Sequence, residues 1–454
     1  MGTYLSRTPG SAGNRKTWTI SFWLKRSKIT SSEQAVFTQR IDSSNRFSFG
    51  VSGSGEFNVY NRVGGSTYNA TTTAVHRDFS AWYHVVYKMD TTQASSSNRQ
   101  AIYVNGVEAS LQTDTVPSQD ADTAVNSTSE CMWGYWANSW GNTQNLDGYL
   151  AECYMIDGQA LTPASFGLTD STTGIWKPKV FSGSYGTNGF FLQFKNSGAL
   201  GTDTSGNGNT WTVNNAGTGA QVTDTPSNNF SIMNIASNYY AQGTFTEGAC
   251  KLVTQGAAYT YNTSTIGVAK GKWYMEVKIG AGVNTWWGVG VAEGESSNAS
   301  GVLGRDTYYP AGNEYGQIGW FGYGTDFVYQ NNGYYTGSTS NYNTDGFTTN
   351  DILSIALDAD NNNVKFYKNG TVQNSGTAFN IGASSTGFWH FAFGDYDGQN
   401  AGSHTFQLNF GNPSFTISSN SGNGYTDANN FGKFQYTVPS GYYALCTENL
   451  NTYG

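Results

Sequence analysis

Apolar and polar residues alternate with period two in several parts of the chain. The clearest segments are residues 17–25 and 83–89 in the first half and residues 272–278 and 353–358 in the second half. In the first segment Trp18, Ile20 and Phe22 share one face, and Thr19 and Ser21 lie on the other. Successive side chains of a strand point to opposite faces of a sheet, so this pattern predicts strands with one buried face. The sequence shows no long helical stripe and no heptads, and we therefore predict an all-β fold.

Two Asn-Gly pairs predict β-hairpins, one in each half of the chain. Asn105-Gly106 and Asn369-Gly370 each follow an alternating strand. Asn and Gly accept positive φ at both central positions of a turn, as the type I′ hairpin turn requires. The two halves are therefore predicted to be diverged copies of one architecture rather than members of a short-period repeat array.

A polar segment separates the two halves. Residues 219–236 show no alternation and include Pro226, one of only eight prolines. We expect a first β-sandwich over residues 1–218, a linker over 219–236, a second β-sandwich over 237–437 and a C-terminal strand or docked tail over 438–454. The predicted fold class is two tandem antiparallel β-sandwiches of jelly-roll type.

Composition supports the all-β prediction and argues against some functions. Of 454 residues, 15% are aromatic and 12% are charged, and 57 are glycine, a combination that favours pleated surfaces and tight turns. The net charge of −8 argues against nucleic acid and against a polybasic membrane contact, since both need a basic face. No apolar stretch has the length of a membrane span, and the N-terminus lacks the apolar core of a signal peptide. We therefore expect no membrane insertion and no export.

Several motifs of the first half occur in the order of a known family. They are the segments 18–23, 82–86, 102–106, 146–152 and 157–162. In this order they resemble laminin-G-like, concanavalin A-like jelly rolls. Such domains often begin with an aromatic strand and an Asp-x-Ser-Gly-x-Gly-Asn turn, which here come afterwards, at 190–194 and 203–209. We hypothesise that residues 187–215 return to complete the first sandwich, as in a circular permutation.

The second half carries another ordered set of motifs. They are the segments 271–276, 287–291, 316–320, 351–358, 364–370 and 391–394. This set resembles SPRY domains over about residues 240–415. The resemblance implies a β-sandwich whose loops bind partners.

The order of the two halves, together with three further segments, resembles a class of viral proteins. The segments are 200–209, 224–230 and 441–446. The combination looks like structural proteins of tailed bacteriophages, notably marine ones. This resemblance implies a virion protein that is made in the host cytoplasm. It also implies assembly with other virion proteins and with further copies of the same chain.

Catalytic motifs are absent from the sequence. Concanavalin A-like sandwiches also include glycosidases, which need two carboxylates on one face. The nearest pair, Asp147 and Glu152, is predicted to lie on opposite faces of a strand. No G-x-S-x-G, H-E-x-x-H or P-loop motif occurs, and the four histidines are scattered. We expect a protein that is not an enzyme, and a polysaccharide-acting enzyme is the least favoured alternative.

Few residues suit a metal ion. Asp203 lies in one Asn- and Gly-rich turn, and Asp358 and Asp360 lie in another. Both turns offer oxygen ligands but lack the remaining ligands of a calcium loop, so we favour polar turns and keep calcium open as a ligand. No cofactor is otherwise expected. Four cysteines without a C-x-x-C pair favour reduced thiols over zinc ligands or two disulfides: Cys131, Cys153, Cys250 and Cys446.

Aromatic clusters in Gly- and Asn-bearing segments are the strongest candidates for a binding site. They comprise Trp136 and Trp140 in the first half and Tyr308, Tyr309, Tyr334 and Tyr335 in the second half. Sugars stack their apolar C–H faces on such rings, while Asn and Asp bind hydroxyl groups. The alternative is that these rings fill the core or cap the ends of the sandwiches. Trp133 continues a strand and is assigned to the core.

These expectations combine into one function. We expect a bacteriophage virion protein with lectin-like loops, part of a tail fibre or adhesin. It would recognise a host-surface glycan or receptor by multivalent weak binding. The alternative is an architectural role, as a capsid decoration or cement protein or as part of the tail.

Overall fold

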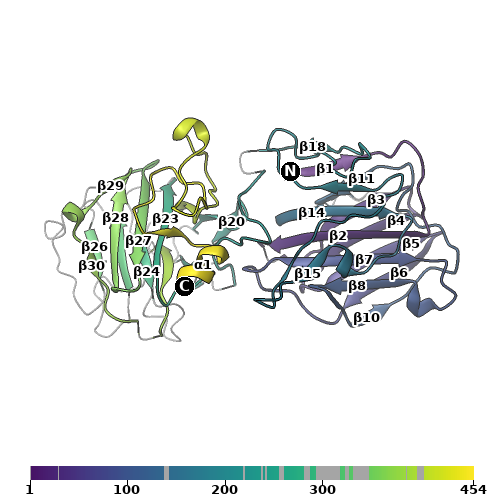
Figure 1. The fold of residues 1–454 in the computed structure, drawn as a ribbon, viewed down its shortest axis with the longest axis horizontal. Coiled ribbons are helices and arrows are strands. Elements are labelled where there is room, and N and C mark those ends of the chain that lie inside the picture. Colours follow the sequence, from purple (N-terminus) through teal and green to yellow (C-terminus); the bar gives the residue numbers. More distant parts are fainter. Residues whose placement is uncertain are drawn as a thin grey trace. The chain divides into compact units, whose positions relative to one another are not determined.

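The computed structural model describes residues 2–28, 30–137, 143–217, 220–236, 239–240, 243–254, 260–280, 287–292, 317–322, 327–330, 347–384, 386–395 and 403–454. The chain divides into two compact units, Met1–Gln221 and Val222–Gly454 (Figure 1). Both units are built from packed antiparallel sheets, so the predicted tandem β-sandwich fold is confirmed.

Two sheets form the first unit. The larger sheet has eight strands in the order β10 (Leu111–Asp114), β6 (Ser66–Thr72), β5 (Phe57–Val63), β4 (Arg46–Val51), β3 (Gln34–Arg40), β11 (Cys131–Trp133), β1 (Tyr4–Arg7) and β18 (Thr212–Asn214). The smaller sheet has six strands in the order β17 (Phe190–Leu192), β14 (Gly148–Asp157), β2 (Thr17–Arg26), β7 (Tyr83–Asp90), β8 (Gln100–Val104) and β9 (Val107–Glu108). Two hairpins accompany the sheets, β12 (Tyr135–Ala137) with β13 (Thr143–Asn145), and β15 (Gly167–Thr169) with β16 (Trp176–Pro178). Short 3-10 helices cover Ser96–Asn98 and Pro163–Ser165.

The core of the first unit lies between its two sheets. Trp18 of β2 packs edge-on against Phe47 of β4, with ring centroids 5.2 Å apart. Phe22 packs in the same way against Trp133 of β11, at 5.7 Å. Buried aromatic rings remove a large apolar area from water, which makes this cluster the main stabilising element of the unit. The assignment of Trp133 to the core is confirmed.

The polar face of β2 is also buried, which differs from the prediction. Residues 158–185 cross this face and add a second apolar cluster that includes Phe166 and Phe181. The polar groups beneath them are paired: Thr19 Oγ1 donates to the carbonyl oxygen of Gln159 at 2.7 Å. Alternation showed which side of β2 is apolar, but it did not show that a later segment covers the other side.

Residues 187–215 do return to the first sandwich, as hypothesised. The strand β17 pairs with β14, and β18 pairs with β1 at the edge of the larger sheet. The turn between these two strands is attached to β17 through Asp203, whose Oδ1 accepts the backbone N–H of Phe191 at 2.9 Å. The aromatic strand and the Asp-x-Ser-Gly turn thus belong to the first unit although they come late in the sequence.

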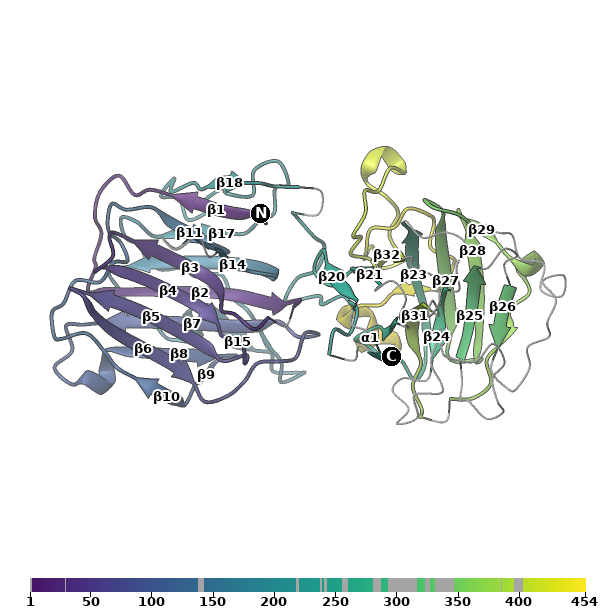
Figure 2. The ribbon, with the colours of Figure 1, turned by 180° about the vertical axis from the view of Figure 1, so that it is seen from behind.

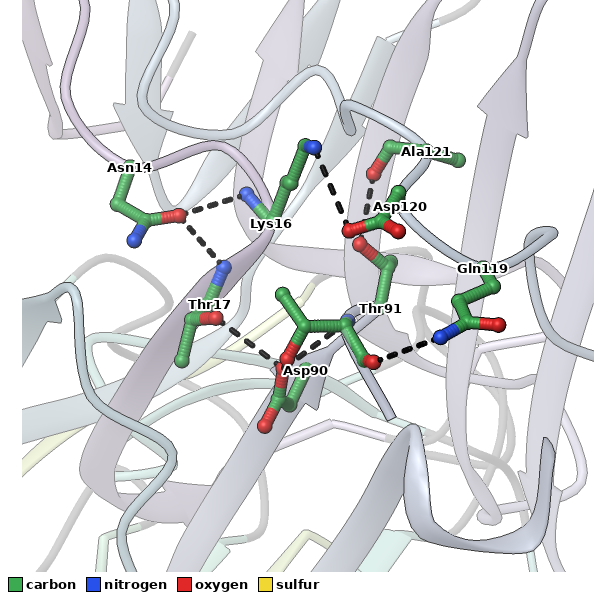
Figure 3. A network of polar contacts seen from close by, with 9 residues as sticks. Asn14, Lys16, Thr17, Asp90, Thr91, Gln119, Asp120 and Ala121 are labelled. Carbon is green, nitrogen blue, oxygen red and sulfur yellow. Dashed lines mark hydrogen bonds and ion pairs between the residues drawn. The ribbon is translucent and has the colours of Figure 1, made fainter. Parts of the chain in front are cut away.

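One end of the first sandwich is closed by a polar network (Figure 3). Asp90, at the end of β7, accepts hydrogen bonds from Thr17 Oγ1 at 3.2 Å and from the backbone N–H of Thr92 at 3.1 Å. Lys16 Nζ lies 3.5 Å from Asp120 Oδ1. Thr91 Oγ1 donates to the carbonyl oxygen of Ala121 at 2.8 Å. The acidic groups at this end therefore hold the chain segments around β2 and β7 together.

The second unit contains two further sheets. One has the order β19 (Tyr239–Tyr240), β22 (Thr260–Thr263), β31 (His390–Asp395), β24 (Trp287–Ala292), β25 (Gln317–Gly322) and β26 (Phe327–Gln330). The other follows β20 (Thr244–Thr246), β21 (Lys251–Val253), β32 (Thr405–Asn409), β23 (Lys272–Ile279), β27 (Ile352–Asp358), β28 (Asn363–Lys368) and β29 (Thr371–Val372). It also includes β30 (Phe379–Asn380), paired with β28, and β33 (Tyr443–Ala444), paired with β23. Short 3-10 helices cover Asn374–Gly376 and Asn420–Gly422, and the helix α1 covers Thr447–Tyr453.

The core of the second unit repeats the principle of the first. Trp273, Met275 and Val277 of β23 are fully buried in one apolar cluster with residues of both sheets. Within the described ranges, no helix is long and apolar enough to span a membrane. The four cysteines are buried thiols, two in each unit.

The unit boundary falls at the start of the segment predicted as a linker. The division lies between Gln221 and Val222, and Phe230, Ile232 and Met233 are buried within the second unit. Residues 230–236 therefore belong to the second sandwich, because their apolar side chains pack there. The predicted C-terminal strand or docked tail is seen as β33 and α1.

Candidate functional site

The outer face of the eight-stranded sheet carries both polar and aromatic side chains. Strands β3, β4, β5 and β6 lie side by side there (Figure 2). Directly paired residues of antiparallel strands point to the same face, so the register defines two outward rows. The first row is Arg40, Arg46, Arg62 and Thr67. The second row is Thr38, Ser48, Tyr60 and Asn69. The alternate positions of β4, Phe47 and Phe49, point into the core.

An arginine held by two aromatic rings lies at the centre of these rows. The guanidinium carbon of Arg46 is 5.1 Å from the ring centroid of Tyr60 and 6.0 Å from that of Trp136. Arg46 Nη2 also donates to the hydroxyl of Tyr60 at 3.0 Å. All three side chains are half-buried. Guanidinium–ring contacts of this kind stabilise a fixed side-chain arrangement and leave ring edges and N–H groups at the surface.

The hairpin β12–β13 places Trp136 over this face. Thr38 Oγ1 donates to the carbonyl oxygen of Tyr135 at 3.0 Å, which fixes the start of the hairpin on β3. The ring of Tyr135 stacks on Tyr4, with centroids 4.5 Å apart. Trp136, next in sequence, therefore points away from the core residue Trp133 and towards Arg46.

A carboxylate borders the other end of the face. Glu33 Oε1 accepts a hydrogen bond from Ser48 Oγ at 3.4 Å. The side chain occupies space that only a glycine leaves open, since a Cβ atom at Gly50 would lie 2.6 Å from Glu33 Oε1. Burial raises the pKa of Glu33, against the effect of its hydrogen bonds to Asn58 and Ser48.

Several polar atoms on this face have no protein partner. They are Arg46 Nε, Asn58 Oδ1 and Asn69 Oδ1. An unpaired polar group shielded from water costs about 1–3 kcal/mol, so these buried atoms gain a hydrogen bond from a ligand only where neighbouring side chains move aside. The face thus combines aromatic rings with donors and acceptors that the protein itself does not satisfy.

Comparison with known protein families assigns both units. A profile described as the concanavalin A-like lectin/glucanases superfamily, of laminin-G type, matches residues 2–165, and a profile of the SPRY domain matches residues 272–413. The chain contains a laminin-G-type domain followed by a SPRY domain. The description of the first family fits a carbohydrate-binding role for the laminin-G-type domain.

Solved structures with distant similarity include three kinds of protein. The SPRY domain of human HERC1 is 14% identical, with 39% of this chain and 96% of that chain covered and a TM-score of 0.27. A putative carbohydrate binding protein from Bacteroides ovatus is 14% identical, with 47% and 56% covered and a TM-score of 0.34. Domains LG4-5 of the mouse laminin alpha1 chain are 10% identical, with 98% and 85% covered and a TM-score of 0.30. No curated protein sequence matches the chain.

The structure describes one of the six predicted aromatic site residues, Trp136 of the laminin-G-type domain. Trp136 is half-buried on the outer face, in contact with Arg46. The other five lie outside the described residues: Trp140, Tyr308, Tyr309, Tyr334 and Tyr335.

The carboxylates proposed for calcium hold turns together. Asp203 accepts hydrogen bonds from the backbone N–H groups of Phe191, Ser205 and Asn209 and from the hydroxyl of Ser205, at 2.7–2.9 Å. In the SPRY domain Asp358 pairs with Lys272 at 2.8 Å and accepts two hydrogen bonds from Asn361. Asp360 accepts the N–H of Gly271 at 2.8 Å. No group of three potential metal ligands occurs among the described residues.

The carboxylate pair considered for glycoside hydrolysis is held by separate contacts. Asp147 pairs with Lys28 at 3.3 Å. Glu152 lies at a register shift of β14, with φ of 47°, and burial raises its pKa. Among the described residues the two carboxylates share no hydrogen-bond or ion-pair partner, and neither lies on the outer face formed by β3 to β6.

Sequence reasoning missed Arg46, Tyr60 and Glu33. Alternation in residues 57–63 would have put Asn58, Tyr60 and Arg62 on one polar face. That signal alone could not show which strand pairs with β5. The contact of Arg46 with both aromatic rings depends on pairing between β4 and β5 and on the return of β12.

Proposed function

We propose that this protein is a non-enzymatic carbohydrate-binding protein and that the outer face of β3 to β6 holds the sugar. The observation that carries the proposal is the cluster of Trp136, Arg46 and Tyr60 beside the unpaired amide oxygens of Asn58 and Asn69. An indole stacks on the apolar face of a sugar ring, and amides and guanidinium groups bind its hydroxyls. Tyr60, Asn58 and Asn69 lie on the same face of neighbouring strands as Arg46, so a carbohydrate of more than one ring could contact them while one ring stacks on Trp136.

The chemistry of the face supports binding without hydrolysis. Glycosidases need an acid and a second carboxylate about 5–10 Å apart. The outward positions of β3 to β6 described above contain Arg, Ser, Thr, Tyr and Asn but no Asp or Glu. Glu33 reaches the face from the preceding segment and is a single carboxylate. A lone carboxylate with a raised pKa can bind a hydroxyl group but lacks the partner that hydrolysis requires.

Glycan binding by the intact chain tests this function. Full-length protein would be applied to an array of neutral and charged oligosaccharides, together with the Trp136→Ala and Trp136→Phe variants. We expect at least tenfold weaker binding for Trp136→Ala, because the stacking surface is lost, and a smaller loss for Trp136→Phe, which keeps a ring. Equal binding by all three proteins, with unchanged folding by circular dichroism, would contradict the proposed site.

We further propose that the protein is a component of a tailed-bacteriophage particle, in a tail fibre or adhesin. The support is the phage-like combination of the two domains with the segments 200–209, 224–230 and 441–446. Many copies on one particle, alongside other virion proteins, would turn weak sugar binding into firm attachment to a host surface. Gold-labelled antibody on intact particles tests this placement. Label at the distal tail supports the adhesin, label over the head supports capsid decoration, and unlabelled particles contradict a virion role.

A further inference from the structure

Arginines occupy directly opposed positions on the proposed sugar-binding face. Arg46 of β4 is the register partner of Arg62 on one side and of Arg40 on the other. Like charges in opposed positions of neighbouring strands destabilise a sheet. Among the described residues, the ion pairs found do not involve Arg46 or Arg62. The row therefore concentrates uncompensated positive charge in a protein whose net charge is −8.

Arg46 and Arg62 have more N–H donors than there are acceptors around them. Arg62 Nε donates to the carbonyl oxygen of Gly65 at 3.0 Å, and Arg46 Nη2 donates to Tyr60 at 3.0 Å. Arg46 Nε has no acceptor in the protein. A guanidinium carries five N–H groups in a planar fork, so each arginine retains donors for a further group.

The carboxylate of Asp42, in the turn between β3 and β4, interacts with the charge of Arg40 rather than with Arg46 or Arg62. Asp42 accepts the backbone N–H groups of Ser44 and Asn45, each at 2.7 Å. These hydrogen bonds and the charge of Arg40 lower the pKa of Asp42. Arg40 Nε in turn donates to the backbone carbonyl of Asp42 at 3.4 Å.

The positive charges of Arg46 and Arg62 also act on the hydroxyl of Tyr60. Burial opposes ionisation of Tyr60, yet hydrogen bonds from Arg46 and Thr67 and the charges of Arg46 and Arg62 lower its pKa. A negative group placed beside the hydroxyl of Tyr60 would be stabilised by the same two guanidinium groups.

We infer that this face selects an anionic sugar, one that carries a carboxylate or a sulfate group. The inference rests on the proposed carbohydrate-binding function. The anion would pair with the guanidinium groups of Arg46 and Arg62, while the sugar ring stacks on Trp136. Guanidinium matches carboxylate and sulfate oxygens through two parallel hydrogen bonds. Contact with two aromatic rings holds Arg46 in place before the ligand arrives, which lowers the entropic cost of binding.

Matched pairs of sugars test this inference on the full chain. Tetragalacturonate would be compared with its methyl ester, and dextran sulfate with dextran, by isothermal titration calorimetry at low and at high salt. We expect at least one anionic member to bind tenfold or more tightly than its neutral counterpart, with a preference that falls at high salt. The pair that shows the preference identifies carboxylate or sulfate as the group recognised.

Three variants locate the preference. Arg62→Gln should reduce the preference to under threefold, and Arg46→Lys should reduce it in part, because a lysine keeps the charge but not the fork. Arg77→Gln is the matched control, since Arg77 lies near Gly55 at the opposite ends of β4 and β5. It should leave the preference unchanged.

The possible failures are distinguishable. If both members of each pair bind equally and Trp136→Ala abolishes that binding, the sugar site stands and the anionic selectivity is overturned. The selectivity at this face is also overturned if it persists in Arg62→Gln and Arg46→Lys. If no sugar binds, both the selectivity and the proposed function are overturned.

Discussion

The indole Nε1 of Trp176 lies 2.9 Å from Nδ1 of His84, on the covered face of the six-stranded sheet. An indole nitrogen can only donate, so Nδ1 accepts and the ring proton of His84 lies on Nε2. Nε2 lies 2.9 Å from Ser21 Oγ and donates to it. This tautomer cannot take a proton from Ser21, so the Ser–His contact is a buried structural pair and does not activate a nucleophile.

Replacing Trp176 by phenylalanine should weaken the cover on this face. The change removes the donor to His84 and leaves Nδ1 without its partner, which costs about 1–3 kcal/mol. Hydrogen exchange of β2 and β7 in the full chain measures the loss. A variant Trp176→Phe with unaltered protection in both strands would show that the hydrogen bond contributes nothing to stability.

The laminin-G-type domain should lose stability in mild acid through His84. Burial lowers the pKa of His84 to about 3 from the ordinary 6.5. The unfolded chain therefore binds a proton below pH 6.5 that the folded chain does not, and stability falls as the pH falls through this range. The expected loss between pH 6.5 and pH 4.5 is about 2–3 kcal/mol. The variant His84→Gln should show a lower stability at pH 7 and lack this part of the acid dependence, and an identical slope in both proteins would rule out the effect.

The SPRY domain should respond to pH in the opposite sense through Glu276. Its carboxylate accepts the backbone N–H groups of Gln435 and Tyr436, each at 2.8 Å, and the amide of Asn409 at 3.0 Å. Burial nevertheless raises the pKa of Glu276 to about 7 from 4.5. The folded state then binds the proton more tightly, so the stability that this group contributes is present at acid pH. This stability, about 3 kcal/mol in all, is lost as the pH rises to about 7.

Hydrogen exchange at Gln435 and Tyr436 measures this effect directly. Opening free energies should fall between pH 5 and pH 7 and level off above pH 8. In Glu276→Gln the amide group meets backbone donors, so protection should be lower throughout and independent of this titration. Opening free energies that rise with pH in the unaltered chain would contradict the expected loss of stability at neutral pH.

Asp203 should stabilise its turn without calcium. Its oxygens already accept hydrogen bonds from Phe191, Ser205 and Asn209. Asp203→Asn should destabilise the laminin-G-type domain by about 1–3 kcal/mol, because an amide N–H would face backbone donors. Melting temperatures in calcium chloride and in EDTA should coincide. A calcium-dependent rise that disappears in Asp203→Asn would instead establish a metal site.

Local sequence pattern was sufficient to predict the main strands and the order of the two domains. The alternation of Trp18, Ile20 and Phe22 reports which side of a strand is apolar, and that property depends only on neighbouring residues. The return of residues 187–215 was also predictable, because an aromatic strand and an Asp-x-Ser-Gly-x-Gly-Asn turn retain their character wherever they occur in the chain.

Tertiary structure alone decided which polar faces are covered and which remain available. Ser21 and Glu276 occupy equivalent polar positions in their strands, and both are buried, because residues 158–185 and 431–438 pack over them. Tyr60 and Arg62 occupy the same kind of position and remain half-exposed. Alternation describes one strand at a time, whereas coverage and the register of β4 with β5 depend on contacts between segments far apart in the sequence. The sequence by itself thus determined two β-sandwiches, and the pairing of strands created the arginine and aromatic face on one of them.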